Sequence, residues 1–173
     1  MNSRTEIPLL VVSNELFRTV MSNGRKIHLD SGANMAKQFL VVTSDEVAAL
    51  DLRTALATST GGDPTVSWAP TLAGAIGELA WHRTDLIILD CNLPDSHGLA
   101  TLDAVHELAP RTPILTLHES EADSSTIFAM QRGARGFLVK GNYGGYMLPL
   151  ALANIIGRDE AEQRLATQHA RAS

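Results

Sequence analysis

The stretch "DLIILDCNLPDSHG", residues 85–98, decides the fold. Four apolar residues, 86–89, are typical of a buried strand, and this strand ends on a carboxylate, Asp90. Pro94 and Gly98 then mark a turn before a helical pattern resumes. An acid placed where a buried strand enters a turn either caps that turn or carries chemistry, and both interpretations are open at this point.

The sequence from residue 39 onward alternates short apolar runs with segments of helical period, which is typical of βα units and a parallel sheet. The central runs are apolar on both faces, as expected when helices cover both sides of the sheet. We therefore predict an α/β fold, a doubly wound five-stranded parallel sheet with helices on both faces. The expected strands are residues 39–42, 65–68, 86–90, 113–117 and 136–139.

The composition excludes several classes of partner. The chain has 173 residues, 45% of them hydrophobic, which suits one domain with some excess length. Its net charge of -5, without a cluster of Lys and Arg, argues against nucleic-acid binding. The apolar runs fall far short of the roughly 20 residues that span a bilayer, and the N-terminus lacks a signal-peptide pattern. We expect no membrane partner and a cytoplasmic location.

The single cysteine, Cys91, follows the acid directly. One cysteine cannot form an internal disulfide, and its place beside a strand end favours a small buried hydrophobe over a reactive thiol.

The ends of the chain fall outside the predicted sheet. We expect one domain at residues 39–157, an N-terminal extension at 1–38 and a polar C-terminal helix extension or tail at 158–173. The run "PLLVVSNELFRTV" in the N-terminal extension looks like a second copy of "FLVVTSDEVAALDL". It is either a chance pattern or an extra strand and helix.

Polar side chains follow several of the predicted strands. Because the carboxyl ends of parallel strands meet at one edge of the sheet, we expect Asp90, His118 and Lys140 to lie close together. A carboxylate opposite a lysine is a candidate phosphoryl acceptor with a positive group to hold the phosphoryl oxygens. The alternatives are a turn cap for Asp90 and a solvent-facing side chain for Lys140.

Three motifs carry a resemblance to a known family. The stretches "LIILDCNLPDSHGL", "TPILTLHE" and "GARGFLVKG" resemble the receiver domain of two-component response regulators, over roughly residues 38–157. The resemblance implies the flavodoxin-like strand order 2-1-3-4-5. It also implies that Asp90 accepts a phosphoryl group from a phosphohistidine and that Lys140 contacts that group.

The first departure from the family pattern concerns its acidic pair. Thr43 and Ser44 stand where the family has two acids that hold magnesium together with the acceptor aspartate. Magnesium prefers oxygen ligands that include one or two carboxylates, so we expect it to bind weakly, through Asp90, a backbone carbonyl near Asn92 and Asp45. Alternatively, "TSDE" is a capping box in which Thr43 bonds the Glu46 amide and Asp45 favours the positive end of the helix.

The second departure is His118, where the family has Thr or Ser. That short hydroxyl bonds the phosphoryl group and lets the aromatic residue on the fifth strand, here Phe137, turn inward. An imidazole is larger and does not reproduce this movement. His118 is either a phosphoryl-contacting residue or a solvated loop residue, and Phe137 is either a switch position or plain core.

Two functions follow from these residues. We expect a receiver-like signalling protein, not an enzyme, that acts through protein contacts with weakened or absent magnesium-dependent phosphorylation. The alternative is a phosphorylatable response regulator that receives its phosphoryl group from a histidine kinase or a phosphotransfer protein. The expected partner surface comprises the fourth helix (residues 124–132), the fifth strand and the fifth helix. A homodimer is possible through the final helix, and no small-molecule substrate is expected.

Overall fold

A five-stranded parallel sheet forms the centre of the molecule. The computed structural model describes residues 37–60, 64–120, 123–143 and 148–155. The sheet order is β2-β1-β3-β6-β7, and every neighbouring pair is parallel. Counted along the sheet strands alone, this is the predicted order 2-1-3-4-5, and each predicted strand boundary is within one residue of the observed one. The strands are β1 Gln38–Val42, β2 Thr65–Ala69, β3 Leu86–Asp90, β6 Ile114–His118 and β7 Gly136–Val139.

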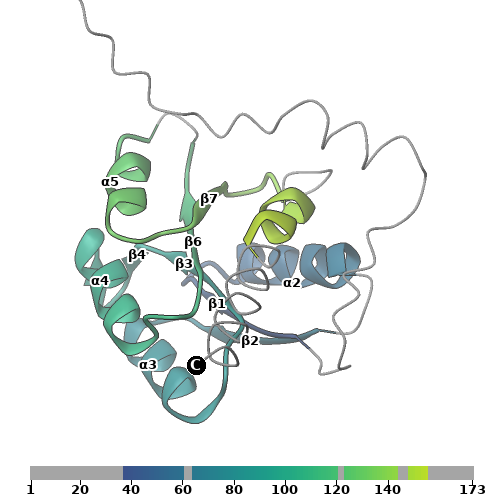
Figure 1. The fold of residues 1–173 in the computed structure, drawn as a ribbon, viewed down its shortest axis with the longest axis horizontal. Coiled ribbons are helices and arrows are strands. Elements are labelled where there is room, and N and C mark those ends of the chain that lie inside the picture. The colour runs from purple at the N-terminus through teal and green to yellow at the C-terminus, as the bar shows by residue number, and fades with distance from the viewer. Residues whose placement is uncertain (1–36, 61–63, 121–122, 144–147, 156–173) are drawn as a thin grey trace, which may run out of the picture.

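Helices cover both faces of this sheet, as predicted (Figure 1). On one face lie α3 (Leu72–Trp81), α4 (Leu99–Leu108) and α5 (Ser125–Gln131). On the other lie α2 (Glu46–Thr60) and the helical residues 148–155. A short antiparallel ribbon, β4 (Asn92–Leu93) with β5 (Ser96–His97), follows Asp90 and was not predicted.

The core consists of two apolar layers, one on each face of the sheet. Alternate residues of β3 supply both layers: Leu86 and Ile88 pack towards α2, while Ile87 and Leu89 pack towards α3 and α4. All five residues of β3 are buried. A strand covered on both faces needs an uninterrupted apolar run, which is why the pattern at 86–89 does not alternate.

The loop after Asp90 is tied to α3 by a carboxylate. The Asp95 side chain accepts hydrogen bonds from the backbone N–H groups of Ala73 (2.9 Å) and Leu72 (2.8 Å) at the start of that helix. These bonds lower the pKa of Asp95 below its ordinary value. They anchor the loop that begins at Asp90 to a neighbouring helix.

The expectations for the two ends of the chain lie outside the described residues. Residues 1–36 and 156–173 are not described, so the extra strand and helix and the polar C-terminal helix stay predictions. Within the described part of the chain, no helix is long and apolar enough to cross a membrane.

Two leucines of α2 provide a matched test of the core. Leu52 is 0% exposed beneath the sheet, whereas Leu50 is 63% exposed on the same helix. We expect Leu52→Ala to lower the free energy of unfolding by about 2–5 kcal/mol, because it leaves a cavity. Leu50→Ala should change it by less than about 1 kcal/mol. Denaturant unfolding of both variants measures the difference, and equal losses would contradict this packing.

Candidate functional site

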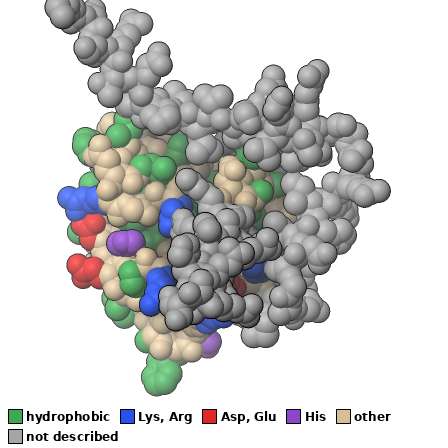
Figure 2. Space-filling view, viewed as in Figure 1, with side chains coloured by type: hydrophobic (Ala, Val, Ile, Leu, Met, Phe, Trp, Pro, Cys, Tyr) green, Lys and Arg blue, Asp and Glu red, His purple; other side chains and the backbone are tan. Residues whose placement is uncertain are grey.

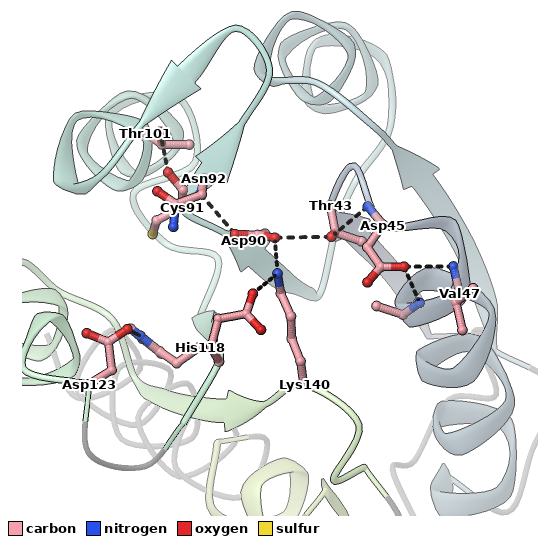
Figure 3. A network of polar contacts seen from close by, with 12 residues as sticks. Thr43, Asp45, Val47, Asp90, Cys91, Asn92, Thr101, His118, Asp123 and Lys140 are labelled. Atoms are coloured by element: carbon pink, nitrogen blue, oxygen red, sulfur yellow. Dashed lines mark hydrogen bonds and ion pairs between the residues drawn. The ribbon is translucent and has the colours of Figure 1, made fainter.

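Asp90 lies at the end of β3 with its carboxylate held by three donors (Figure 3). Its side chain is almost completely buried, and the whole residue is 3% exposed. Oδ2 accepts a hydrogen bond from Thr43 Oγ1 (3.2 Å) and lies 2.8 Å from Lys140 Nζ. Oδ1 accepts from the backbone N–H of Asn92 (2.9 Å). A buried carboxylate is tolerated only where it is paired and hydrogen-bonded, and these three contacts supply that pairing.

Lys140 follows the last residue of β7 and bridges two carboxylates. Its Nζ lies 2.8 Å from Asp90 Oδ2 and donates to Glu119 Oε1 at 2.7 Å. Burial alone would lower the pKa of Lys140, but the bonds and charges of Asp90 and Glu119 outweigh it and raise that pKa above its ordinary value. Lys140 therefore carries a permanent positive charge opposite Asp90. The contact with Glu119 was not predicted, although its position directly after a strand end was a signal for it.

Thr43 and Asp45 form a different arrangement from the predicted capping box. The Thr43 hydroxyl accepts from the backbone N–H of Asp45 (3.2 Å) and donates to Asp90. Asp45 is the residue that caps α2, because its Oδ1 accepts from the N–H groups of Val47 (3.0 Å) and Ala48 (3.1 Å). Thr43 is fully buried, and a buried hydroxyl beside a carboxylate bonds it in preference to the helix end.

His118, the last residue of β6, is buried and turned towards α5. It is 5% exposed, so the solvated-loop interpretation is wrong. Its Nε2 lies 2.8 Å from Thr116 Oγ1, and its Nδ1 lies 3.2 Å from both Asp123 Oδ2 and Ser125 Oγ. The ring meets Phe137 edge to face, with ring centroids 6.0 Å apart. Among the described residues, the polar contacts of its ring are thus with Thr116 and with the start of α5, and not with Asp90.

A family comparison agrees with this geometry. A model described as the response regulator receiver domain matches residues 39–144, which is more than half of the chain. The chain belongs to this receiver family. Receiver domains are signalling modules of two-component response regulators and generally not enzymes; they interact with histidine kinases and other proteins and typically bind Mg²⁺ at the phosphorylation site.

The relatives of this receiver include regulatory proteins that are longer than the matched region. The swarming motility regulation protein RssB of Serratia marcescens is 32% identical over 97 residues, which are 56% of this chain and 41% of RssB. The regulatory protein LuxO of Vibrio cholerae serotype O1 is 38% identical over 66 residues, which are 38% of this chain and 14% of LuxO. The chain therefore matches less than half the length of these curated relatives.

Solved receiver structures share the fold. The signal receiver domain of an HD domain-containing protein from Pseudomonas fluorescens Pf-5 superimposes with a TM-score of 0.66 at 24% identity. The match covers 78% of this chain and 96% of that structure. At this identity the likeness shows the fold alone.

The residues around Asp90 differ from the acidic pair implied by the family pattern. Asp90 is the carboxylate at the centre of the site, and both of its oxygens already accept from protein donors. Asp45 bonds the first turn of α2, and Glu119 bonds Lys140. Among the described residues, no group of three or more His, Cys, Asp or Glu side chains is placed to hold a metal ion. Beside Asp90, Thr43 supplies a hydroxyl where the family pattern has a carboxylate.

Asp123 connects His118 to the first turn of α5. Hydrogen bonds from the Ser125 side chain (2.6 Å), from the Ser125 backbone (2.9 Å) and from His118 lower the pKa of Asp123 to about 2. Its carboxylate is therefore ionised at neutral pH and available to the imidazole. The sequence analysis missed Thr116, Asp123 and Ser125. The signals were the capping pattern "DSS" before a helix and the two-residue spacing that puts Thr116 and His118 on one face of a strand.

Cys91 is half-buried between the site and the α3–α4 layer. Burial, together with the charges of Asp90 and Asp123, raises the pKa of the Cys91 thiol to about 12. The thiol stays protonated at neutral pH and is a poor nucleophile, in agreement with the predicted role as a small hydrophobe.

The two roles considered for Asp45 differ in their response to magnesium. If Asp45 caps α2, Asp45→Ala should lower the free energy of unfolding by about 1 kcal/mol, equally with and without MgCl₂. Ser44→Ala is the matched control, because Ser44 is exposed and should cost little. Thermal unfolding at both magnesium concentrations measures this. A loss that appears only when magnesium is present would instead identify Asp45 as a metal ligand.

Proposed function

We propose that this receiver domain acts through protein contacts and that magnesium-dependent phosphorylation of Asp90 is weakened. The observation that carries the proposal is the set of partners of Asp90, which are Thr43, Lys140 and a backbone N–H, without a second acid. Phosphoryl transfer depends on positioning and on neutralising the negative charge of the transition state. A site with Lys140 but without carboxylates for a metal supplies only part of that neutralisation.

The proposed output surface comprises α5, β7 and residues 148–155. Three of its apolar side chains are largely exposed: Ile127, Phe128 and Met130, all on α5. Large exposed apolar side chains gathered on one short helix favour a protein partner. This surface is the partner region expected from the sequence, and it contains the predicted fourth helix.

His118 supports the idea that this surface is held in one state. Its ring bonds Asp123 and Ser125, so the end of β6 is tied directly to the start of α5. A switch requires an element with two arrangements that the site biases differently. The buried imidazole, held on both nitrogens and packed against Phe137, favours a single arrangement whatever happens at Asp90.

A second candidate is a phosphorylatable receiver, and the pairing of Asp90 with Lys140 at 2.8 Å favours it. In that case a carboxylate oxygen of Asp90 attacks the phosphorus of a phosphohistidine on a kinase or phosphotransfer protein. The P–N bond breaks, and the electron pair returns to the imidazole. Lys140 would hold the transferred oxygens.

The proposal also includes the division of the chain into a domain and two extensions, its location and its pairing with a second copy. The receiver-like part, residues 39–157, would be flanked by the extensions 1–38 and 158–173. A cytoplasmic location and pairing of two copies through the final helix remain part of the same interpretation.

The chemistry of Asp90 is tested by intact-mass spectrometry after incubation with acetyl phosphate and MgCl₂. We expect the wild type to gain a phosphoryl group at least about a hundredfold more slowly than the double variant Thr43→Asp, Ser44→Asp, because the variant restores the missing acids. Adding Asp90→Asn to the double variant is the control and should abolish the mass gain. If the wild type is phosphorylated as fast as the double variant, the weakened-chemistry proposal is wrong and the second candidate stands.

Hydrogen exchange at the backbone amides of α5 tests whether His118 holds the output surface in one state. His118→Leu keeps the bulk of the side chain but removes both ring nitrogens, so it should release Asp123 and Ser125 and speed exchange in the first turn of α5. Asp90→Asn, which removes the charge of the acceptor, should leave the same amides unchanged. Faster exchange in the Asp90→Asn variant would show that the acceptor controls this surface.

A further inference from the structure

A pocket of about 290 Å³ lies away from Asp90, between the ends of α4 and α5. Its walls include Pro110 and Pro113, from the loop that enters β6, and Arg135, which precedes β7. The amino ends of parallel strands lie at the edge of the sheet opposite their carboxyl ends. The pocket is therefore on the far edge from Asp90 and Lys140, and it was not predicted from the sequence.

Positive and polar groups line this pocket. It contains Arg111, Arg135 and His106, and none of the described residues that line it is acidic. Neither arginine forms an ion pair with another described residue, whereas Arg83 and Arg132 pair with Asp85 and Asp103. Figure 2 shows a histidine on the side of the molecule that carries α4 and α5, with both basic and acidic side chains near it. Two arginines that line one small pocket and have no ion-pair partner among the described residues favour an anionic ligand.

The position of His106 depends on Gly133. A Cβ atom at Gly133 would lie 3.3 Å from His106 Cε1, and its φ of +99° also favours glycine. The imidazole thus packs against bare backbone at the wall of the pocket. Its Nδ1 is buried and has no hydrogen-bond partner among the described residues. A buried polar atom without a partner costs free energy.

We propose that this pocket binds a small phosphate monoester. The guanidinium groups of Arg111 and Arg135 would bind the phosphate oxygens in bidentate fashion, and His106 would add a third donor. A tetrahedral phosphate dianion offers three acceptor oxygens and two charges, which suits this set better than a carboxylate does. Met130 and the two prolines supply apolar walls for the organic part of the ligand. The volume, at the lower end for small-molecule sites, limits that part to about one sugar or one base with its sugar.

The pocket lies at the C-terminal end of α5, whereas His118 bonds residues at the N-terminal end of the same helix. Met130 is in the last turn of α5, and Gly133 follows its end. A ligand bound here would therefore lie against α5, the centre of the proposed partner surface. The binding proposal itself does not rest on the phosphorylation state of Asp90, because the two sites share no residue.

Calorimetric titration of the 173-residue chain tests the site. The probes are adenosine 5′-monophosphate, inorganic phosphate, adenosine and succinate. We expect saturable binding of the nucleotide, weaker binding of inorganic phosphate, and none of adenosine or succinate. Arg111→Gln and Arg135→Gln should each weaken nucleotide binding about tenfold or more, since each removes a charge-assisted hydrogen bond. Both arginines are exposed, so the variants should fold normally.

Arg53→Gln is the matched control, because it removes the same charge from an exposed position on α2, across the sheet. It should leave nucleotide affinity within about twofold of the wild type. An equal loss in Arg53→Gln, or no binding of either phosphate probe, would overturn the proposal. Asp90→Asn should bind the nucleotide like the wild type, so this result is independent of the test of phosphorylation.

Discussion

The buried charge of Asp90 is the constraint on which the rest of the site depends. A carboxylate that is 3% exposed at the end of a central strand must be paired and hydrogen-bonded, or it would destabilise the fold. Its partners come from three places: Thr43 after β1, Lys140 after β7 and the backbone of the loop after β3. One charge thus draws together the ends of strands that are far apart in the sequence.

The same constraint explains what replaces the acids of the receiver pattern. Two further carboxylates beside Asp90 would repel it unless a cation lay between them. Thr43 removes that repulsion, since its hydroxyl donates to Asp90, and Lys140 supplies the positive charge from the protein itself. Asp90 thus has its hydrogen-bond and ion-pair partners within the protein, which is the physical basis for proposing that its magnesium-dependent phosphorylation is weakened.

His118 is a second buried polar group that needs partners inside the fold. His118 is buried on the α5 face, and its two nitrogens require partners there, which Thr116, Asp123 and Ser125 provide. A threonine at this position would need fewer partners and would be free to turn. The imidazole instead joins the end of β6 to the start of α5. Asp90 and His118, which both end strands at the carboxyl edge of the sheet, therefore have different hydrogen-bond partners among the described residues.

The sequence by itself determined the fold, because apolar periodicity and strand-to-helix alternation follow from covering both faces of a sheet, and a run such as 86–89 admits few alternatives. It also identified Asp90 and Lys140, since strand ends in a parallel sheet share one edge. Only the tertiary structure decided the direction of each side chain: that Asp45 caps α2, that Glu119 binds Lys140, and that His118 turns to α5. Hydrogen bonds act over about 3 Å, so these choices depend on distances that the spacing of residues along the chain does not specify.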